Sequence, residues 1–308
     1  MSGEIIIGVD LGGTEIKSVA ASYPDGETLR QETLPTCDGE SEEGIPVFVR
    51  NVAELIRGHE EALGVVHGVG LSAPGLASKS GDAIAFMPGR MEGLENLVWR
   101  EVLKRTQPVP VLNDAHAALM GEIWLGAAKG LSDVVMYTLG TGVGGAIVSG
   151  GRLLRGHFGR AGHLGHTTVD FLGAADFCNT PGSIEDAIGN LTIQQRSGGV
   201  FDTTHELIAA YASGDAHAAE IWRRSLKALA ASIVSMANAV DPEVVVLGGG
   251  ITAAKEHLYE PLRKLIAERE WTPAGARIEV RQAELGTWAG AYGAACHAAR
   301  TVIDSGIL

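Results

Sequence analysis

The chain of 308 residues has few cysteines and a shortage of basic residues. Its three cysteines, Cys37, Cys178 and Cys296, are far apart and odd in number, so we expect no disulfide framework and a reducing, cytoplasmic environment. Lys and Arg number 24 against 37 Asp and Glu, which gives a net charge of −13. Because this acidic chain carries no block of Lys or Arg, we expect no nucleic-acid partner.

Long apolar runs and two common nucleotide-binding motifs are missing as well. No apolar run reaches the length that spans a bilayer, and no signal peptide precedes the first predicted strand, so we expect no membrane partner. No G-x-x-x-x-G-K-S/T segment occurs, which excludes the P-loop NTPases. Residues 140–145 have the spacing G-x-G-x-x-G, but a β-rich segment follows where a Rossmann dinucleotide site requires a helix.

Glycine is abundant instead, with 42 residues gathered at the ends of predicted strands. Residues 5–17 and 134–148 each read as a strand, a Gly/Thr turn and a second strand. In a chain longer than one core usually supports, these two hairpins indicate an internal duplication and two domains. Glycines leave backbone N–H groups accessible, so each turn can cradle a phosphate. The glycines could instead form plain hairpin turns, but the repeat and the carboxylate of Asp10 favour an ATP site in which Asp10 faces Mg²⁺.

Outside the hairpins, strand patterns alternate with helix patterns, which predicts an α/β protein rather than a sandwich or a bundle. The predicted helices cover residues 45–63, 113–129, 216–239, 255–270 and 288–303, and a further helical segment is expected beyond Ser183. The predicted strands cover residues 65–72, 109–112, 244–247 and 277–282. Residues 81–99 are interrupted by Pro and Gly and are interpreted as an irregular, ligand-facing segment.

Two polar groups lie next to these elements. Asn113-Asp114 is either an ordinary helix N-cap or the place where the Asp114 carboxylate acts as a general base, and the two roles are compatible. His157, His163 and His166 lie close together in the sequence, near a single thiol. A structural zinc site needs four good donors, so polar contacts with a substrate are the favoured role for at least one of these histidines.

Together these residues resemble the ROK family of bacterial sugar kinases and repressors, including its glucokinase-like members, over nearly the whole chain. Four motifs occur in the family's order. They are D-x-G-G-T-x-x-K at residues 10–17, N-D-A-x-A-A followed by G-E at 113–122, G-T-G-x-G-G at 140–145, and D-P-x-x-V-x-L-G-G-G at 241–250.

The resemblance implies an actin/hexokinase-like (ribonuclease H-like) α/β fold of two domains, with nucleotide and sugar in the interdomain cleft. The N-terminal domain would comprise residues 1–113 and about 289–308, and the C-terminal domain about 114–288. The implied activity is the phosphorylation of a hydroxyl group of a hexose or hexose-like sugar by ATP with Mg²⁺. Asp114 would accept the proton of that hydroxyl, and the implied assembly is a homodimer.

The resemblance also assigns the other site residues. The sugar contacts would be made by Gly75, Asn113, His163, His166 and Glu185. The ATP and magnesium contacts would be made by Asp10, Gly12, Gly13, Thr14, Lys17, Thr138, Gly140, Thr141, Gly142, Gly144, Gly248 and Gly249.

The chain departs from the family pattern in two places. The A-G-E-x-G-H motif has His163 where the family has a sugar-binding Glu, which puts glucose itself in doubt as the substrate. The zinc motif C-x-C-G-x-x-G-C-L-E falls on residues 176–185 and keeps only Cys178 of its three cysteines, so we expect no structural zinc.

Three alternatives follow from these departures and from the family's breadth. They are a kinase for a non-glucose sugar or a polyol, a sugar-binding or sensing protein with little or no kinase activity, and a repressor. A repressor would carry a helix-turn-helix ahead of the first motif, for which the few residues before Glu4 leave no room.

Overall fold

The computed structural model describes residues 3–305, which form two compact α/β units. The first unit comprises the chain up to Gly130, residues 155–160 and the chain from Glu284 onward, and the second comprises residues 131–154 and 161–283. The boundary expected from the sequence differs from this division. Residues 114–130, 155–160 and 284–288 belong to the first unit, in part because the helix that starts at Asp114 packs against the C-terminal helix.

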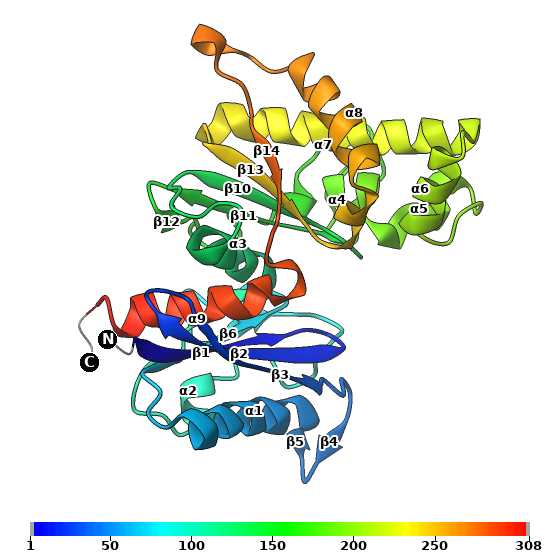
Figure 1. Ribbon diagram of the computed structural model, residues 1–308. Coiled ribbons are helices and arrows are strands. Elements are labelled where there is room, and N and C mark those ends of the chain that lie inside the picture. Colours follow the sequence, from blue (N-terminus) through cyan, green and yellow to red (C-terminus); the bar gives the residue numbers. More distant parts are fainter. Residues whose placement is uncertain (1–2, 306–308) are drawn as a thin grey trace. The chain divides into compact units, whose positions relative to one another are not determined.

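The first unit is built on a five-stranded mixed sheet in the order β3-β2-β1-β6-β9 (Figure 1). β1 (Glu4–Leu11), β2 (Glu15–Tyr23) and β3 (Thr28–Pro35) form an antiparallel meander, and β6 (Gly68–Ala73) and β9 (Val111–Asn113) continue the sheet in the direction of β1. The strand period of two sends alternate side chains of β1 to opposite faces of the sheet. Ile7 and Val9 join one hydrophobic cluster, while Ile6 joins another.

Helices cover both faces of this sheet. α1 (Val47–Leu63) covers one face and α9 (Ala289–Val302) the other, and α3 (Asp114–Leu125) packs on α9. Glycines permit the close approach of α9, since a Cβ at Gly8 or Gly70 would overlap a carbonyl oxygen of that helix. The shorter elements are β4 (Ser41–Glu42), β5 (Ile45–Pro46), β7 (Leu76–Ala77), β8 (Ile84–Phe86), α2 (Trp99–Val102) and the 3₁₀ turn η5 (Gly286–Trp288).

The second unit repeats the sheet of the first, with the strand order β12-β11-β10-β13-β14 and the same pattern of directions. The strands are β10 (Val134–Leu139), β11 (Val143–Ser149), β12 (Arg152–Leu153), β13 (Val244–Gly248) and β14 (Val280–Gln282). The matching order and directions agree with the internal duplication that the two glycine hairpins predict.

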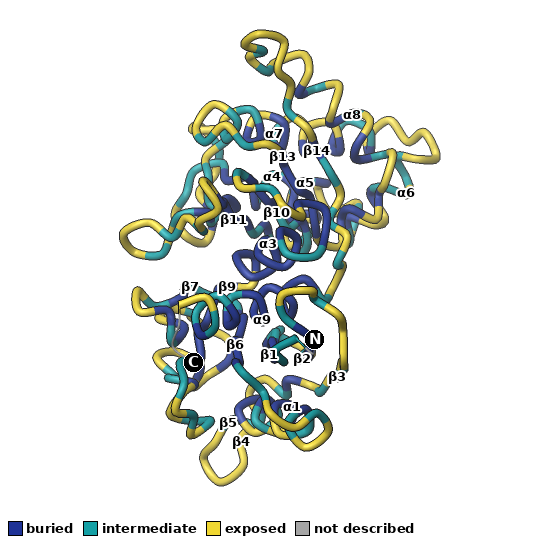
Figure 2. Tube along the Cα trace, turned by 60° about the vertical axis from the view of Figure 1, so that its left-hand side comes forward, coloured by how far each residue is buried: buried dark blue, intermediate teal, exposed yellow. Residues whose placement is uncertain are grey.

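The helices of the second unit pack on this sheet around one hydrophobic cluster, and the central strands are buried in both units (Figure 2). The helices are α4 (Ile184–Ile188), α5 (Ile193–Ser197), α6 (Thr204–Ala212), α7 (Ala216–Val240) and α8 (Glu256–Ala267). The 3₁₀ turns are η1 (Leu164–His166), η2 (Asn190–Thr192), η3 (Gly250–Ala254) and η4 (Pro273–Gly275). α6 begins with a capping box between Thr203 and Glu206, and α7 ends at Asp241 in the left-handed conformation.

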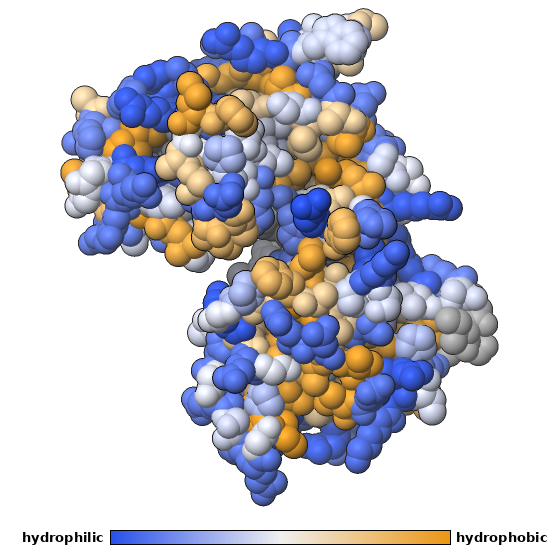
Figure 3. Space-filling model, turned by 180° about the vertical axis from the view of Figure 1, so that it is seen from behind, coloured by the Kyte–Doolittle hydropathy of each residue, from blue (hydrophilic) through white to orange (hydrophobic). Residues whose placement is uncertain are grey.

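The predicted α/β class is confirmed, and each predicted helix is present, including the one beyond Ser183, which is α4. α3 ends four residues earlier than expected, at Leu125, because the backbone of Gly126 leaves the helical conformation, with φ −114° and ψ −145°. Within residues 3–305, no helix combines the length and the apolar character needed to cross a bilayer. One face of the surface carries apolar groups separated by polar side chains (Figure 3).

Candidate active site

The first glycine turn, Gly12–Thr14, connects β1 to β2 and is held to the chain that follows β3. The N–H of Gly12 donates to the carbonyl of Glu15 at 3.1 Å, and the hydroxyl of Thr36 donates to the carbonyl of Gly12 at 2.6 Å. A cavity of about 740 Å³ opens at this turn. Its lining includes the predicted nucleotide residues Gly12, Gly13, Thr14 and Lys17.

Asp10 lies at the end of β1, with Lys17 on one neighbouring strand and Ser72 on the other. The Ser72 hydroxyl donates a hydrogen bond to the Asp10 carboxylate. A Cβ at Gly290, in the first turn of α9, would lie 2.6 Å from the carboxyl carbon of Asp10, so only glycine fits there. Desolvation, with the negative charge of Asp114 adding to it, raises the pKa of Asp10 to about 6.

Asn113 and Asp114 have different local roles at the start of α3. The side-chain oxygen of Asn113 accepts the N–H groups of Ala115 at 3.0 Å and His116 at 3.3 Å, which is the predicted N-cap. Its amide donates to the carbonyl of Gly75 at 2.9 Å, so two predicted sugar residues lie together. The Asp114 side chain remains exposed.

Asp114 is accessible to solvent but is surrounded by many protein atoms, and the resulting partial desolvation raises the pKa of its carboxyl above the ordinary value, while hydrogen bonds and the positive charge of Arg90 act in the opposite direction. The strand register brings these two predicted residues together in the first unit, because Asp10 lies opposite Ser72 on β6, and Asn113, which precedes Asp114, lies opposite the next residue of β6, Ala73. Arg90 is also a neighbour of this site; the sequence predicts that residues 81–99 face a ligand but does not single out this residue.

The second glycine turn, Gly140–Gly142, connects β10 to β11. Thr138 pairs with Gly144 on one side and Gly248 on the other, so three predicted nucleotide residues lie side by side on adjacent strands. Thr138 has the same place in its sheet as Asp10 has in the first sheet. Gly249 has φ +87°, and a Cβ there would overlap the Leu139 carbonyl, so this position requires glycine.

One predicted sugar residue of the second unit, Glu185, lies against this turn. The Glu185 carboxylate accepts the N–H of Val143 at 2.8 Å, so that N–H is already occupied. A Cβ at Gly142 would lie 3.0 Å from the carboxyl carbon of Glu185. Gly165, in the 3₁₀ turn that includes His166, lies close to the Val143 carbonyl. His163 precedes this turn and is half-buried, whereas His157 belongs to the first unit.

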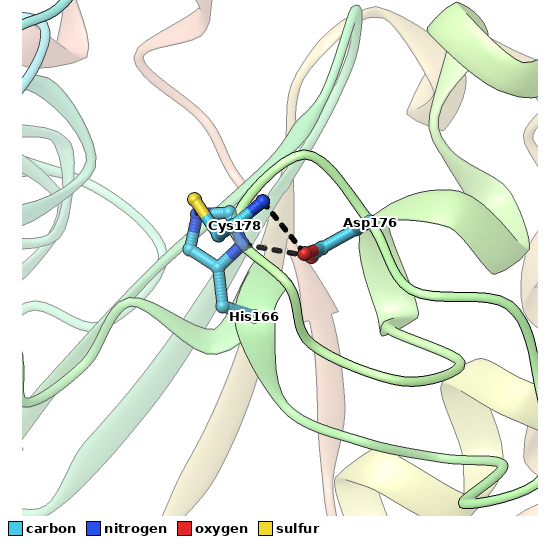
Figure 4. Close-up of side chains that lie close together, drawn as sticks. All are labelled: His166, Asp176 and Cys178. Carbon is cyan, nitrogen blue, oxygen red and sulfur yellow. Dashed lines mark hydrogen bonds and ion pairs between the residues drawn. The ribbon is translucent and has the colours of Figure 1, made fainter.

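The side chain of Asp176 holds the loop that follows His166 (Figure 4). Its Oδ1 accepts the N–H groups of Cys178 at 2.9 Å and Thr180 at 2.8 Å, and its Oδ2 lies 3.1 Å from Nδ1 of His166. Desolvation opposes ionisation here, but these hydrogen bonds and one with Ser183 hold the pKa of Asp176 below its ordinary value.

His166 lies beside Asp176 and Cys178 at the start of the altered zinc motif, and the potential ligand atoms of these three side chains lie within 4.8 Å of one another. A structural zinc takes four strong donors, usually several thiolates. Here both oxygens of Asp176 are already hydrogen-bonded, and Ser183 stands in the place of a thiolate. Only Nε2 of His166 and Sγ of Cys178, 3.8 Å apart, remain. This donor set does not fit a four-coordinate structural zinc.

Comparisons with known proteins agree with these observations over almost the entire chain. A glucokinase of Thermotoga maritima is 33% identical over 310 residues, which cover 94% of this chain and 96% of that protein. An N-acetylmannosamine kinase of Escherichia fergusonii is 28% identical, covering 94% of this chain and 96% of that protein.

Two crystal structures are similar throughout. A ROK hexokinase from Thermus thermophilus has a TM-score of 0.85 and 31% identity, covering 97% of this chain and 99% of that one. A ROK family glucokinase from Streptomyces griseus, in complex with glucose and AMPPNP, has a TM-score of 0.75 and 28% identity, covering 96% of this chain and 99% of that one. The predicted actin/hexokinase-like α/β fold is thereby confirmed. Because residues 6–301 match the family model as well, the chain belongs to the ROK family.

Proposed function

We propose that the chain transfers the γ-phosphoryl group of ATP to a hydroxyl group of a hexose or hexose-like sugar, with Asp114 as the general base. The observation that carries this proposal is the arrangement in the first unit. Asp10 near the end of β1, the glycine turn that follows it and Asp114 at the start of α3 lie at the carboxyl ends of neighbouring parallel strands, because β6 pairs with β1 at Asp10 and with β9 at Asn113. Similarity to kinases of glucose and of N-acetylmannosamine supports the class of substrate.

In this mechanism the protein supplies orientation and charge rather than covalent chemistry. Asp114 accepts the proton as the sugar oxygen bonds to the γ-phosphorus and the bond to ADP breaks. Mg²⁺, when bound with ATP, neutralises phosphate charge, and Asp10 is the carboxylate that would hold it. In the second unit we assign Thr138 and the glycines of its turn to the nucleotide, and His163, His166 and Glu185 to the sugar.

The identity of the sugar depends on His163. A carboxylate only accepts hydrogen bonds, whereas a neutral imidazole has one donor and one acceptor nitrogen, so position 163 favours a different hydroxyl or ring substituent than Glu would. A kinase for a non-glucose sugar or a polyol is therefore the second candidate. A sugar-binding protein with little or no kinase activity is the third, and the retained Asp10 and Asp114 count against it.

We also propose a cytoplasmic homodimer. The location is supported by three free cysteines. The assembly is supported by apolar side chains in one loop of the second unit. Phe171, Leu172 and Phe177 have exposed fractions of 81%, 93% and 76%. Exposed apolar groups of this kind are typical of contacts between proteins.

The first test is calorimetry with Mg²⁺ and the analogue AMPPNP. We expect one binding event per chain. If folded protein binds no adenine nucleotide, the kinase proposal is wrong.

The raised pKa of Asp10 predicts how this affinity depends on pH. Mg²⁺ prefers an ionised carboxylate, and the ionised fraction of Asp10 falls as the pH drops through about 6. We expect the Kd of Mg²⁺–AMPPNP to rise about tenfold for each pH unit below that value and to level off above it. Because the phosphates of the nucleotide also titrate, the Asp10→Asn variant serves as the reference. If the Kd of the wild type depends on pH no more steeply than the Kd of this variant, Asp10 does not belong to the magnesium site.

Because hydrogen bonds to Asp176 hold its loop in place, we expect the stability of the protein to be independent of zinc. We expect much less than one zinc ion per chain by elemental analysis after purification without chelator. EDTA should leave the melting temperature unchanged, because hydrogen bonds rather than a metal hold residues 176–183. One tightly bound zinc ion per chain would overturn this interpretation.

A further inference from the structure

Arg90 is a cation that touches the first glycine turn. It follows Pro88-Gly89 in the segment between β8 and α2, and its side chain is exposed. A Cβ at Gly13 would overlap Nη2 of Arg90 and would lie 3.0 Å from its Cζ. The guanidinium therefore lies directly against the turn that we assign to the phosphates.

The same guanidinium also acts on Asp114. Its positive charge lowers the pKa of that carboxyl, against the larger effect of desolvation. Within residues 3–305, Arg90 has no hydrogen bond and no ion pair, so its five N–H donors are available to a ligand.

The site needs such a cation. Asp10 and Asp114 already repel each other, and a triphosphate adds further negative charge. The other nearby cation, Lys17, is paired with Glu15 at 3.1 Å. A guanidinium presents a planar fork of donors that matches two phosphoryl oxygens at once, which an ammonium group does not.

We propose that Arg90 is a catalytic residue that donates hydrogen bonds to the γ-phosphoryl group as it passes from ATP to the sugar. The proposal rests on the kinase function above. The sugar oxygen forms the new bond to phosphorus, the bond to the β–γ bridging oxygen breaks, and the proton goes to Asp114. Arg90 neutralises charge on the non-bridging oxygens throughout and loses no proton.

Two other roles are possible for this residue. As a partner of Asp114 alone, it would leave nucleotide affinity unchanged. As a ligand for an anionic group on the sugar, it would act on the KM of that sugar and not on the nucleotide. Its contact with Gly13, inside the nucleotide motif, favours the phosphoryl group.

The test compares Arg90→Gln and Arg90→Lys with Arg57→Gln. Arg57 is an exposed residue of α1 whose guanidinium lies 3.9 Å from Glu61, so its loss controls for a lost positive charge in the same unit. Calorimetry with Mg²⁺ measures the Kd of AMPPNP and of ADP, and steady-state assays measure kcat and the sugar KM.

For Arg90→Gln we expect AMPPNP affinity to fall about tenfold to hundredfold, ADP affinity to stay within about twofold, and kcat to fall about 10²-fold or more. Arg90→Lys should be intermediate, and Arg57→Gln should match the wild type. Equal effects on AMPPNP and ADP, no effect on either, or an effect confined to the sugar KM would overturn the proposal.

The ratio of the AMPPNP Kd to the ADP Kd, measured for the wild type and for Arg90→Gln, separates this inference from the proposed function. If the wild type has no kinase activity but Arg90→Gln selectively loses AMPPNP, the kinase assignment fails and the contact with the γ-phosphoryl group stands. If the wild type is an active kinase and Arg90→Gln retains its kcat and its AMPPNP affinity, only the role of Arg90 is wrong.

Discussion

Replacing Asp114 by Asn is expected to lower kcat for sugar phosphorylation about 10²–10⁴-fold, because an amide cannot accept the proton of the attacking hydroxyl. The variant should fold, since the Asn113 side chain caps α3 and remains in place. AMPPNP should bind it at least as tightly as it binds the wild type, because a negative charge near the phosphates is removed.

The control for this variant is Asp82→Asn. Asp82 is another aspartate of the first unit, and its carboxylate accepts the hydroxyls of Ser78 and Ser80. An amide oxygen can accept these bonds, so this variant should keep the wild-type rate. If Asp114→Asn also phosphorylates sugar near the wild-type rate, Asp114 is not the base.

Replacing Glu122 by Ala is expected to destabilise the first unit by roughly 3–5 kcal/mol. Glu122 is fully buried, and its carboxylate accepts the backbone N–H groups of Ala127, Glu284 and Leu285 at 2.8–3.1 Å. These bonds tie the end of α3 to the segment that leads into α9. Alanine would leave the buried N–H of Ala127 and the partly buried N–H groups of Glu284 and Leu285 without their acceptor, and a buried donor left unpaired costs about 1–3 kcal/mol.

Scanning calorimetry with Glu243→Ala as the reference checks this prediction. Glu243 also accepts two backbone N–H groups, those of Ser132 at 2.7 Å and Asp133 at 3.0 Å, but it is exposed. Water can replace its carboxylate, so we expect a loss of about 1 kcal/mol or less. Similar melting temperatures for the two variants would mean that burial of the Glu122 carboxylate contributes little.

The sequence predicts those parts of the fold that are specified by residues close together in the chain. The two hairpins, the α/β alternation and the N-cap at Asn113 are each encoded within a few neighbouring residues. β3 was not predicted, because its segment T-L-R-Q-E-T-L-P forms the edge of the sheet and alternates exposed with half-buried side chains. α3 lies in the first unit, whereas the sequence places it in the C-terminal domain, because its packing partner α9 follows about 165 residues later in the chain.

The site shows the same division between local and long-range information. Asp10, Asp114 and the glycines could be identified from motifs. Nothing in the sequence around Arg90 connects it with Gly13, because that contact depends on the path of the loop after β8. The G-E pair at residues 121–122 belongs to a motif, but its structural role requires α9. A Cβ at Gly121 would overlap the Ala289 carbonyl, and Glu122 binds the residues just before that helix.

The most direct test of the kinase assignment is to incubate the wild-type protein with ATP, Mg²⁺ and a panel of hexoses, amino sugars and polyols, and to quantify ADP and sugar phosphate together. We expect at least one sugar to yield phosphorylated product in a one-to-one ratio with ADP, and Asp114→Asn to yield almost none. If the folded protein binds nucleotide but no sugar in the panel gains phosphate above background, the chain is a sugar-binding protein and not a kinase.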